Sequence, residues 1–109
     1  AGAFPTWLNP VQVKLLPVTD RAAEYAGDIA AKLDSQGFRV EVDGRNEKIG
    51  KKIREAQLEK IPYMLVVGDR DMEAGTVSVR HRAEGDLGAM SLEDFAKLLG
   101  EEVRTKAIK

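Results

Sequence analysis

Residues 38–68 read FRVEVDGRNEKIGKKIREAQLEKIPYMLVVG and contain a strand pattern, a helix pattern and a second strand pattern. Phe38 to Val42 alternates apolar and polar side chains, which is typical of a strand. Apolar residues then recur at helical spacing over 47–60, and Pro62 separates that helix from Tyr63 to Gly68, a fully apolar strand. Because a crossover of more than a dozen residues joins the two strands, we expect them to run parallel with a right-handed connection.

The segments on either side extend the same arrangement. Upstream, residues 12–18 form an apolar strand, Thr19 supplies a helix N-cap, and the helix ends at Gly37. Downstream, a seven-residue turn at 69–75 allows strand 76–82 to pair antiparallel, and a last amphipathic helix follows. The sequence therefore predicts an α/β domain with three helices and a mixed, mostly parallel five-stranded sheet, whose strands are 12–18, 38–42, 63–68, 76–82 and 85–89.

Length and composition limit the classes of function. The 109 residues suit one domain, in which residues 1–10 form an irregular lead-in and residues 11–109 the folded part. The chain has no cysteine and one histidine, His81, which excludes thiolate catalysis and metal sites built on cysteines or a histidine cluster. With no apolar run long enough to cross a membrane and no sign of a secretory leader, the expected location is the cytoplasm.

Motifs of enzyme active sites are missing as well. No glycine-rich dinucleotide or phosphate loop follows the first strand, and the serines lack the context of a nucleophile. His81 lies on an alternating strand, where a packed side chain is a better interpretation than a catalyst. A solvated turn is likewise preferred to a cation site at Asp69, Asp71 and Glu73. The sequence predicts no catalytic residue and no metal ligand.

One basic segment stands out from a nearly neutral chain. The net charge is −1, but residues 45–54 carry five basic side chains and one acidic one. The ordinary interpretation is the solvated face of an amphipathic helix with Asn46 as its N-cap. Lys48 and Lys51, however, fall near the helix start, where the macrodipole disfavours cations by about 0.3–1 kcal/mol each. Because cations and free N–H groups at a helix start suit a phosphate, an anion or RNA site is about equally supported.

Arg80 and Arg82 lie on the polar face of the expected strand 76–82. An exposed strand arginine most often guards a sheet edge. Its alternative use is bidentate recognition of a guanine edge, for which the flat guanidinium is suited. Trp7 and the tyrosines do not form a spaced aromatic platform, so RNA binding by base stacking has little support.

Six segments of the chain resemble one known family: FPTWL at 4–8, RNEKIG at 45–50, KIRE at 52–55, IPYMLV at 61–66, GTVSVR at 75–80 and DLG at 86–88. In order and over the whole chain they are similar to the C-terminal anticodon-binding domain of bacterial threonyl-tRNA synthetases, which are class II enzymes. The resemblance implies the class IIa anticodon-binding fold. It also implies recognition of the threonine anticodon, mainly its middle G and its third-position U.

The resemblance further implies the residues of the site. Contacts to the anticodon are expected from Asn46, Lys48, Lys60, Asp71 and Arg80. Candidate phosphate contacts are the basic residues around them: Arg45, Lys51, Lys52 and Arg82. Lys60 stands where arginine is familiar in the family, and Asp71 where glutamate is. The middle G is assigned to Arg80.

In the family this domain follows a catalytic domain that holds the class II motifs and the sites for ATP, Mg²⁺ and Zn²⁺, and the enzyme is expected to be a homodimer. This chain alone is therefore expected to bind the anticodon loop of tRNA(Thr) without a cofactor and without catalysis. Two alternatives stay open: a protein-interaction or regulatory module that reuses the fold, and the equivalent domain of a prolyl, glycyl or histidyl enzyme. A flavodoxin-like small-molecule domain is a third hypothesis, against which the missing phosphate loop counts.

Overall fold

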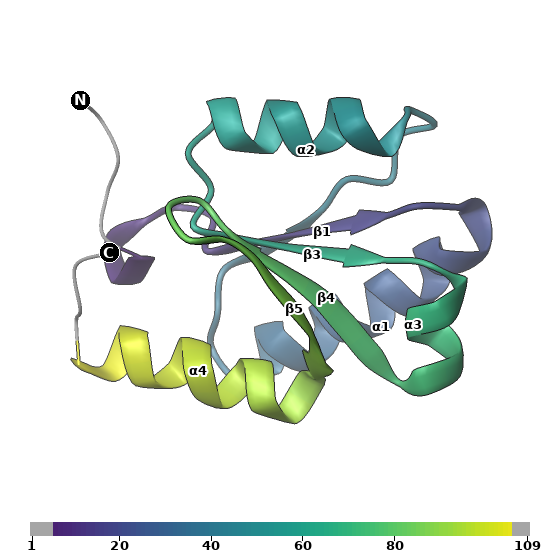
Figure 1. The fold of residues 1–109 in the computed structure, drawn as a ribbon. Coiled ribbons are helices and arrows are strands. Elements are labelled where there is room, and N and C mark those ends of the chain that lie inside the picture. Colours follow the sequence, from purple (N-terminus) through teal and green to yellow (C-terminus); the bar gives the residue numbers. More distant parts are fainter. Residues whose placement is uncertain (1–5, 106–109) are drawn as a thin grey trace.

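A single sheet organises the chain in the computed structural model, which describes residues 6–105 (Figure 1). Its strands follow the order β2-β1-β3-β4-β5. They are β1 (Val13–Pro17), β2 (Val40–Val42), β3 (Tyr63–Val67), β4 (Thr76–His81) and β5 (Gly85–Ser91). β1 pairs in parallel with β2 and β3, whereas β4 pairs antiparallel with β3 and β5. The prediction of a mixed five-stranded sheet, in which the first three strands are parallel and strand 76–82 is antiparallel, is confirmed.

The helices of the described residues differ in one respect from the prediction. They are the short 3-10 helix η1 (Thr6–Leu8) and the α-helices α1 (Asp20–Ser35), α2 (Ile49–Leu58), α3 (Asp69–Ala74) and α4 (Leu92–Thr105). The expectation of three helices is wrong because residues 69–74 form a short helix instead of a turn. The carboxylate of Asp71 accepts the N–H of Gly68 at 3.1 Å, and Gly75, with φ +71°, ends the helix.

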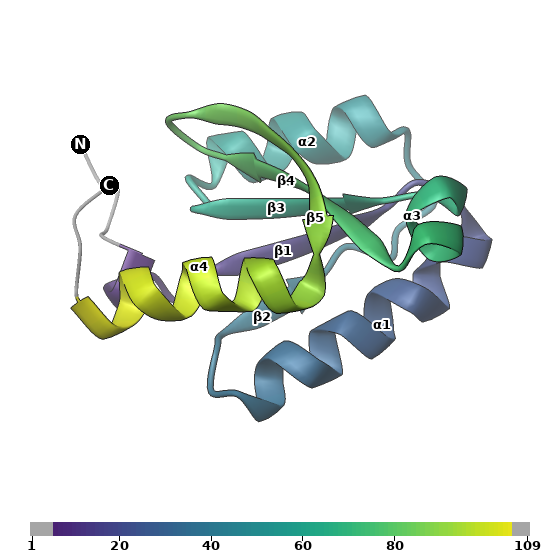
Figure 2. The same cartoon turned by 60° about the horizontal axis from the view of Figure 1, so that its bottom comes forward.

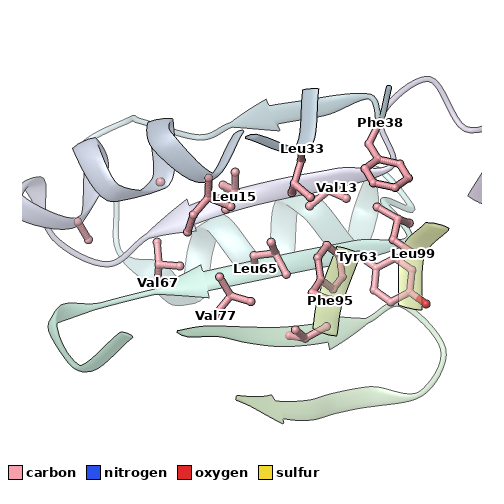
Figure 3. Packing of buried hydrophobic residues seen from close by; sticks show 14 residues of the cluster. Val13, Leu15, Leu33, Phe38, Tyr63, Leu65, Val67, Val77, Phe95 and Leu99 are labelled. Carbon is pink, nitrogen blue, oxygen red and sulfur yellow. The ribbon is translucent and has the colours of Figure 1, made fainter. Parts of the chain in front are cut away.

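Helices cover both faces of the sheet. α1 and α4 lie against one face and α2 against the other (Figures 1 and 2). Because strand side chains alternate, Leu15 and Leu65 join the main core with α1 and α4, as Figure 3 shows. Leu16 and Met64 point the other way, into a smaller cluster beneath α2. The molecule therefore has three layers with a large core and a small one.

The layer formed by α2 stops at β3. Its cluster takes strand residues from β1 and β3. The side chains of β4 alternate between buried and half-buried, and the half-buried ones are Thr76, Ser78 and Arg80. Their buried neighbours Val77 and Val79 belong to the core on the opposite face. Arg80 therefore lies on the same side of the sheet as α2, next to that helix rather than beneath it.

The described part of the lead-in is tied to the rest of the domain. Gln12 donates from Nε2 to the carbonyl of Thr6 at 3.1 Å. Arg39 donates to the carbonyls of Asn9 and Trp7, both at 2.8 Å. The predicted lead-in also includes residues 1–5, which lie outside the described residues. Between residues 6 and 105, no helix has the length and apolar character needed to cross a membrane.

Candidate nucleic-acid interface

A cavity of about 250 Å³ opens between the carboxyl ends of β1 and β2. The chain continues from β1 into α1 on one face of the sheet and from β2 into α2 on the other (Figure 1). The cavity thus lies at the carboxyl ends of parallel strands, the edge where open α/β sheets bind their ligands, one strand away from the switch point between β1 and β3. Residues 17–20 line one wall of the cavity, and residues 44–47 line the other, with Lys52 also contributing. The predicted site residue Asn46 thus lies at this edge of the sheet.

A buried carboxylate holds the loop that carries Asn46. Asp43 is only 5% exposed, and its two oxygens accept hydrogen bonds from Nε and Nη2 of Arg45, both at 2.8 Å. These side-chain hydrogen bonds lower the pKa of Asp43 to about 2, although burial acts in the opposite direction. Arg45 also forms an ion pair with Glu55 of α2 at 3.0 Å. The loop is therefore fixed to α2.

Lys52 reinforces the same loop from inside. Its side chain is buried at 3% exposure, and Nζ donates to the carbonyl oxygens of Pro17 (3.1 Å) and Asp43 (3.2 Å). One ammonium group thus joins the chain just after β2 to the last residue of β1. Arg45 and Lys52 were two of the candidate phosphate contacts. The structure places the charged groups of both in hydrogen bonds within the fold.

The start of α2 differs from the sequence expectation. Its N-cap is Lys48, and no side chain caps the first turn. The expectation that Asn46 is the N-cap is wrong, because a bend closed by the N–H of Glu47 and the carbonyl of Arg45 (2.9 Å) separates Asn46 from the helix. Asn46 and Lys48 are both exposed. An exposed cation and an amide therefore flank an uncapped helix start, which favours an anionic ligand.

The residue after the other end of α2 has an unusual backbone conformation. Lys60 is a non-glycine residue with φ +59°, in the left-handed region. Its carbonyl oxygen accepts from Nη1 of Arg82 at 3.0 Å and from Nδ2 of Asn9 at 3.5 Å. Left-handed conformation costs an L-residue roughly 1–2 kcal/mol. Strain of this kind persists where surrounding contacts impose it and is common at functional sites.

Asp71 of α3 and Arg80 of β4 are joined by a row of polar side chains along β4. Oδ1 of Asp71 accepts from the hydroxyls of Thr76 (3.0 Å) and Ser78 (3.3 Å), so its carboxylate lies at the start of this row. Arg80 follows two residues after Ser78, about 7 Å further along the strand. Its Nε is buried and has no hydrogen-bond partner within residues 6–105. The row therefore presents an acidic group, two hydroxyls and an arginine on the side of α2.

His81 points to the opposite face. It is buried, and its Nδ1 accepts the N–H groups of Ala83 and Glu84 at 3.1 Å each. Its ring packs edge-on against the ring of Tyr63, with 4.9 Å between the two ring centroids. The prediction of a packed histidine is confirmed.

The structure brings the five predicted anticodon contacts to one side of the sheet. Asn46 and Lys48 precede α2, Lys60 follows it, and Asp71 and Arg80 lie on the neighbouring row. The helix of ten residues separates its two ends by about 15 Å. Of the candidate phosphate contacts, Lys51 is exposed on α2 and pairs with Glu47 at 3.3 Å. Among the described residues no group of three histidine, cysteine or carboxylate side chains could hold a metal.

Sequence reasoning missed one feature beside this row. β5 has an irregular pairing with β4 at Val79 and Arg80, where Asp86 comes to lie opposite Arg80. The signal was present: Gly88 interrupts an expected strand, and an isolated glycine in a strand pattern indicates a bulge.

Fold and site together define a recognition domain. Cations, an amide and strand side chains gather at the ends and side of one helix, and they form the kind of one-sided polar surface that binds nucleic acid.

The comparisons with known proteins agree with this class and make it specific. The family described as "Anticodon binding domain" matches residues 12–102, and the chain belongs to that family. The threonine–tRNA ligase of Syntrophomonas wolfei is 59% identical over 107 residues, which cover 98% of this chain and 17% of that protein. The threonine–tRNA ligase of Caldanaerobacter subterraneus is 57% identical over 108 residues, 99% of this chain and 17% of that protein.

A solved structure is similar as well. The RNA-binding domain of threonyl-tRNA synthetase from Cryptosporidium parvum superposes with a TM-score of 0.88 and 31% identity, and the match covers 92% of this chain and 25% of that one. The family resemblance predicted from the sequence is confirmed, and the alternative families are not favoured. The chain spans 17% of the length of the two threonine–tRNA ligases.

Proposed function

We propose that this chain recognises the anticodon loop of tRNA(Thr) as the C-terminal domain of a threonine–tRNA ligase. Identity of 57–59% to two such ligases over nearly the whole chain supports the assignment to threonine. The joining of threonine to tRNA is assigned to parts of the ligase beyond this chain. The sites for ATP, Mg²⁺ and Zn²⁺, a homodimer contact and a cytoplasmic location are proposed for that longer protein.

The position of Arg80 on β4 is the observation that carries the proposal. The side chain of Arg80 is half-buried on the face of the sheet that α2 covers, and its buried Nε has no hydrogen-bond partner among the described residues. Two of its N–H groups can donate in parallel to O6 and N7 of a guanine, a pair of acceptors that no other base presents in this arrangement. We assign to Arg80 the middle G of the anticodon.

The remaining residues have complementary roles in the proposal. Asn46 and Lys60 are assigned to the third base and its neighbours, and Lys48 and Lys51 to phosphates near the start of α2. The carboxylate of Asp71 already accepts three hydrogen bonds, from Thr76, Ser78 and Gly68. An ionised carboxylate has about four acceptor positions, so one stays available for an N–H group of the base. Arg45, Lys52 and Arg82 are assigned to holding the loops in place.

The test is a binding matrix with the 109-residue chain and Arg80→Ala. Each protein is titrated with a threonine anticodon stem-loop and with the same stem-loop carrying A in place of the middle G. We expect Arg80→Ala to lose roughly 1–3 kcal/mol of binding free energy with the first RNA and little with the second. Arg104→Ala is the matched control, because Arg104 is exposed on α4, on the other face of the sheet.

The results of this titration distinguish a residue that recognises the base from one that contacts a phosphate. Equal weakening with both RNAs would make Arg80 a phosphate contact rather than a reader of the base. Lys48→Ala provides the comparison, since the loss of one phosphate contact should weaken both RNAs alike and reduce the salt slope by about one. No binding of either RNA by the unmodified chain would contradict the proposed function.

A further inference from the structure

A β-bulge lies opposite Arg80. Val79 pairs with Gly88 and Arg80 pairs with Asp86, so β5 contributes one additional residue, Leu87, between these two pairs. Gly88 adopts φ +87°, which suits glycine, and its N–H donates to Oδ1 of Asp86 at 2.8 Å. Bulges of this kind redirect side chains and recur beside functional sites.

The bulge decides which side chain Arg80 faces. In an uninterrupted antiparallel ladder the residue opposite Arg80 would be Leu87, because Gly88 is opposite Val79. In this structure Leu87 packs instead against the main core on the other face. Asp86 takes the place opposite Arg80, where Cβ atoms of paired residues lie about 4.5–5.5 Å apart. The irregularity replaces an apolar neighbour of the arginine by a carboxylate.

The carboxylate of Asp86 forms no ion pair with the guanidinium of Arg80 in the described part of the chain. Within residues 6–105 the structure forms no ion pair between Arg80 and an acidic side chain. Oδ1 of Asp86 accepts the N–H of Gly88, and the buried Nε of Arg80 has no partner in the part of the chain that the structure describes. Asp86 is exposed, so its negative charge lies on the surface that an RNA would approach. Arg80 thus has an acidic neighbour with which it forms no ion pair among the described residues.

We propose that Asp86 determines specificity by repelling phosphate groups from Arg80, which leaves the guanidinium to an uncharged base edge. The inference rests on the proposed function. An arginine on a basic surface binds the phosphates of any sequence, and such contacts add affinity without discrimination. A phosphate beside Asp86 meets a like charge, whereas O6 and N7 of guanine carry no net charge. Penalising the wrong ligand is a general source of specificity.

Asp86→Asn tests the inference because asparagine keeps an oxygen that can accept from Gly88 and removes only the charge. The variant and the unmodified chain are titrated with the two stem-loops, carrying G or A at the middle position, over a range of salt concentrations. We expect the A stem-loop to bind about two- to fivefold more tightly to the variant, the size of one exposed charge interaction. The G stem-loop gains less, so the ratio between the two affinities falls.

Two further variants complete the test. Asp28→Asn makes the same change of net charge on an exposed position of α1, on the other face of the sheet, and is expected to leave the ratio unchanged. Asp86→Glu keeps the charge and is expected to keep the ratio near that of the unmodified chain. An unchanged ratio in Asp86→Asn, or an equal change in Asp28→Asn, would overturn the inference while the proposed function stands. If the unmodified chain binds both RNAs equally, the base-reading role of Arg80 fails first, and the inference fails with it.

Discussion

Two pairs of cations on the α2 side of this domain have the same charge and very different surroundings. Arg45 and Lys52 lie in the loop and first half of α2, where a buried carboxylate and two carbonyl oxygens engage their charged groups. Lys48 is exposed at the start of the same helix, and Arg80 keeps an unpartnered Nε on β4. The first pair is engaged within the fold, and the second pair is the one to which we assign contacts with RNA. A basic stretch in a sequence therefore combines two kinds of cation.

Among the variants that test the difference between these two pairs of cations, Lys52→Met should have the largest effect. Methionine fills similar space but donates no hydrogen bond, so the carbonyls of Pro17 and Asp43 lose a buried partner and the carboxylate of Asp43 loses a nearby cation. We expect the free energy of unfolding to fall by about 3 kcal/mol, measured by urea denaturation. The salt slope of RNA binding should stay unchanged at temperatures where the variant is folded.

Lys51→Met is the matched control for this prediction, because Lys51 is an exposed neighbour on the same helix. It should change stability little and lower the salt slope. The opposite pattern, a stable Lys52→Met with a salt slope reduced by about one, would make Lys52 a phosphate contact after all.

Asp43→Asn should have the next largest effect, and one that depends on pH. The folded-state pKa of Asp43 is lowered from 3.8 to about 2, first through the hydrogen bonds from Arg45. A lowered pKa stabilises the fold above the unfolded value, and this contribution disappears as the pH falls from about 4 to about 2. The variant should therefore lose about 2 kcal/mol of unfolding free energy at pH 7 and very little at pH 2.

Denaturation curves of Asp43→Asn and of the unmodified chain between pH 2 and pH 7 measure this difference. Asp28→Asn, an exposed substitution on α1, controls for the change of net charge. A constant difference between Asp43→Asn and the unmodified chain across this range would show that the charge of Asp43 is not what holds the loop.

The sequence predicts the sheet well and the site only in part. Crossover length determines the strand directions, because parallel neighbours need a connection of a dozen or more residues, whereas the short segment after β3 allows an antiparallel neighbour. The short helix α3 escaped prediction because one carboxylate, Asp71, converts a turn into a helix. The family resemblance predicts five site residues, but it does not indicate which cations are engaged within the fold. That distinction depends on contacts over long sequence separations, such as Lys52 with Pro17.

Lys60→Gly should have the smallest effect on stability and sharpens the comparison, because stability and binding are expected to change in opposite directions. Lys60 occupies the left-handed region, which costs an L-residue roughly 1–2 kcal/mol, and glycine relieves this strain while losing about 0.5–1 kcal/mol of chain entropy. The variant should therefore be more stable by about 0.5–1 kcal/mol in urea denaturation. Its affinity for the threonine anticodon stem-loop should fall nevertheless, since the ammonium group is gone. Lys60→Ala separates the two effects, because alanine removes the charge and keeps the strain: it should weaken binding as much as glycine does without the gain in stability. If both variants bind as tightly as the unmodified chain, Lys60 belongs with Arg45 and Lys52 among the residues that serve the fold.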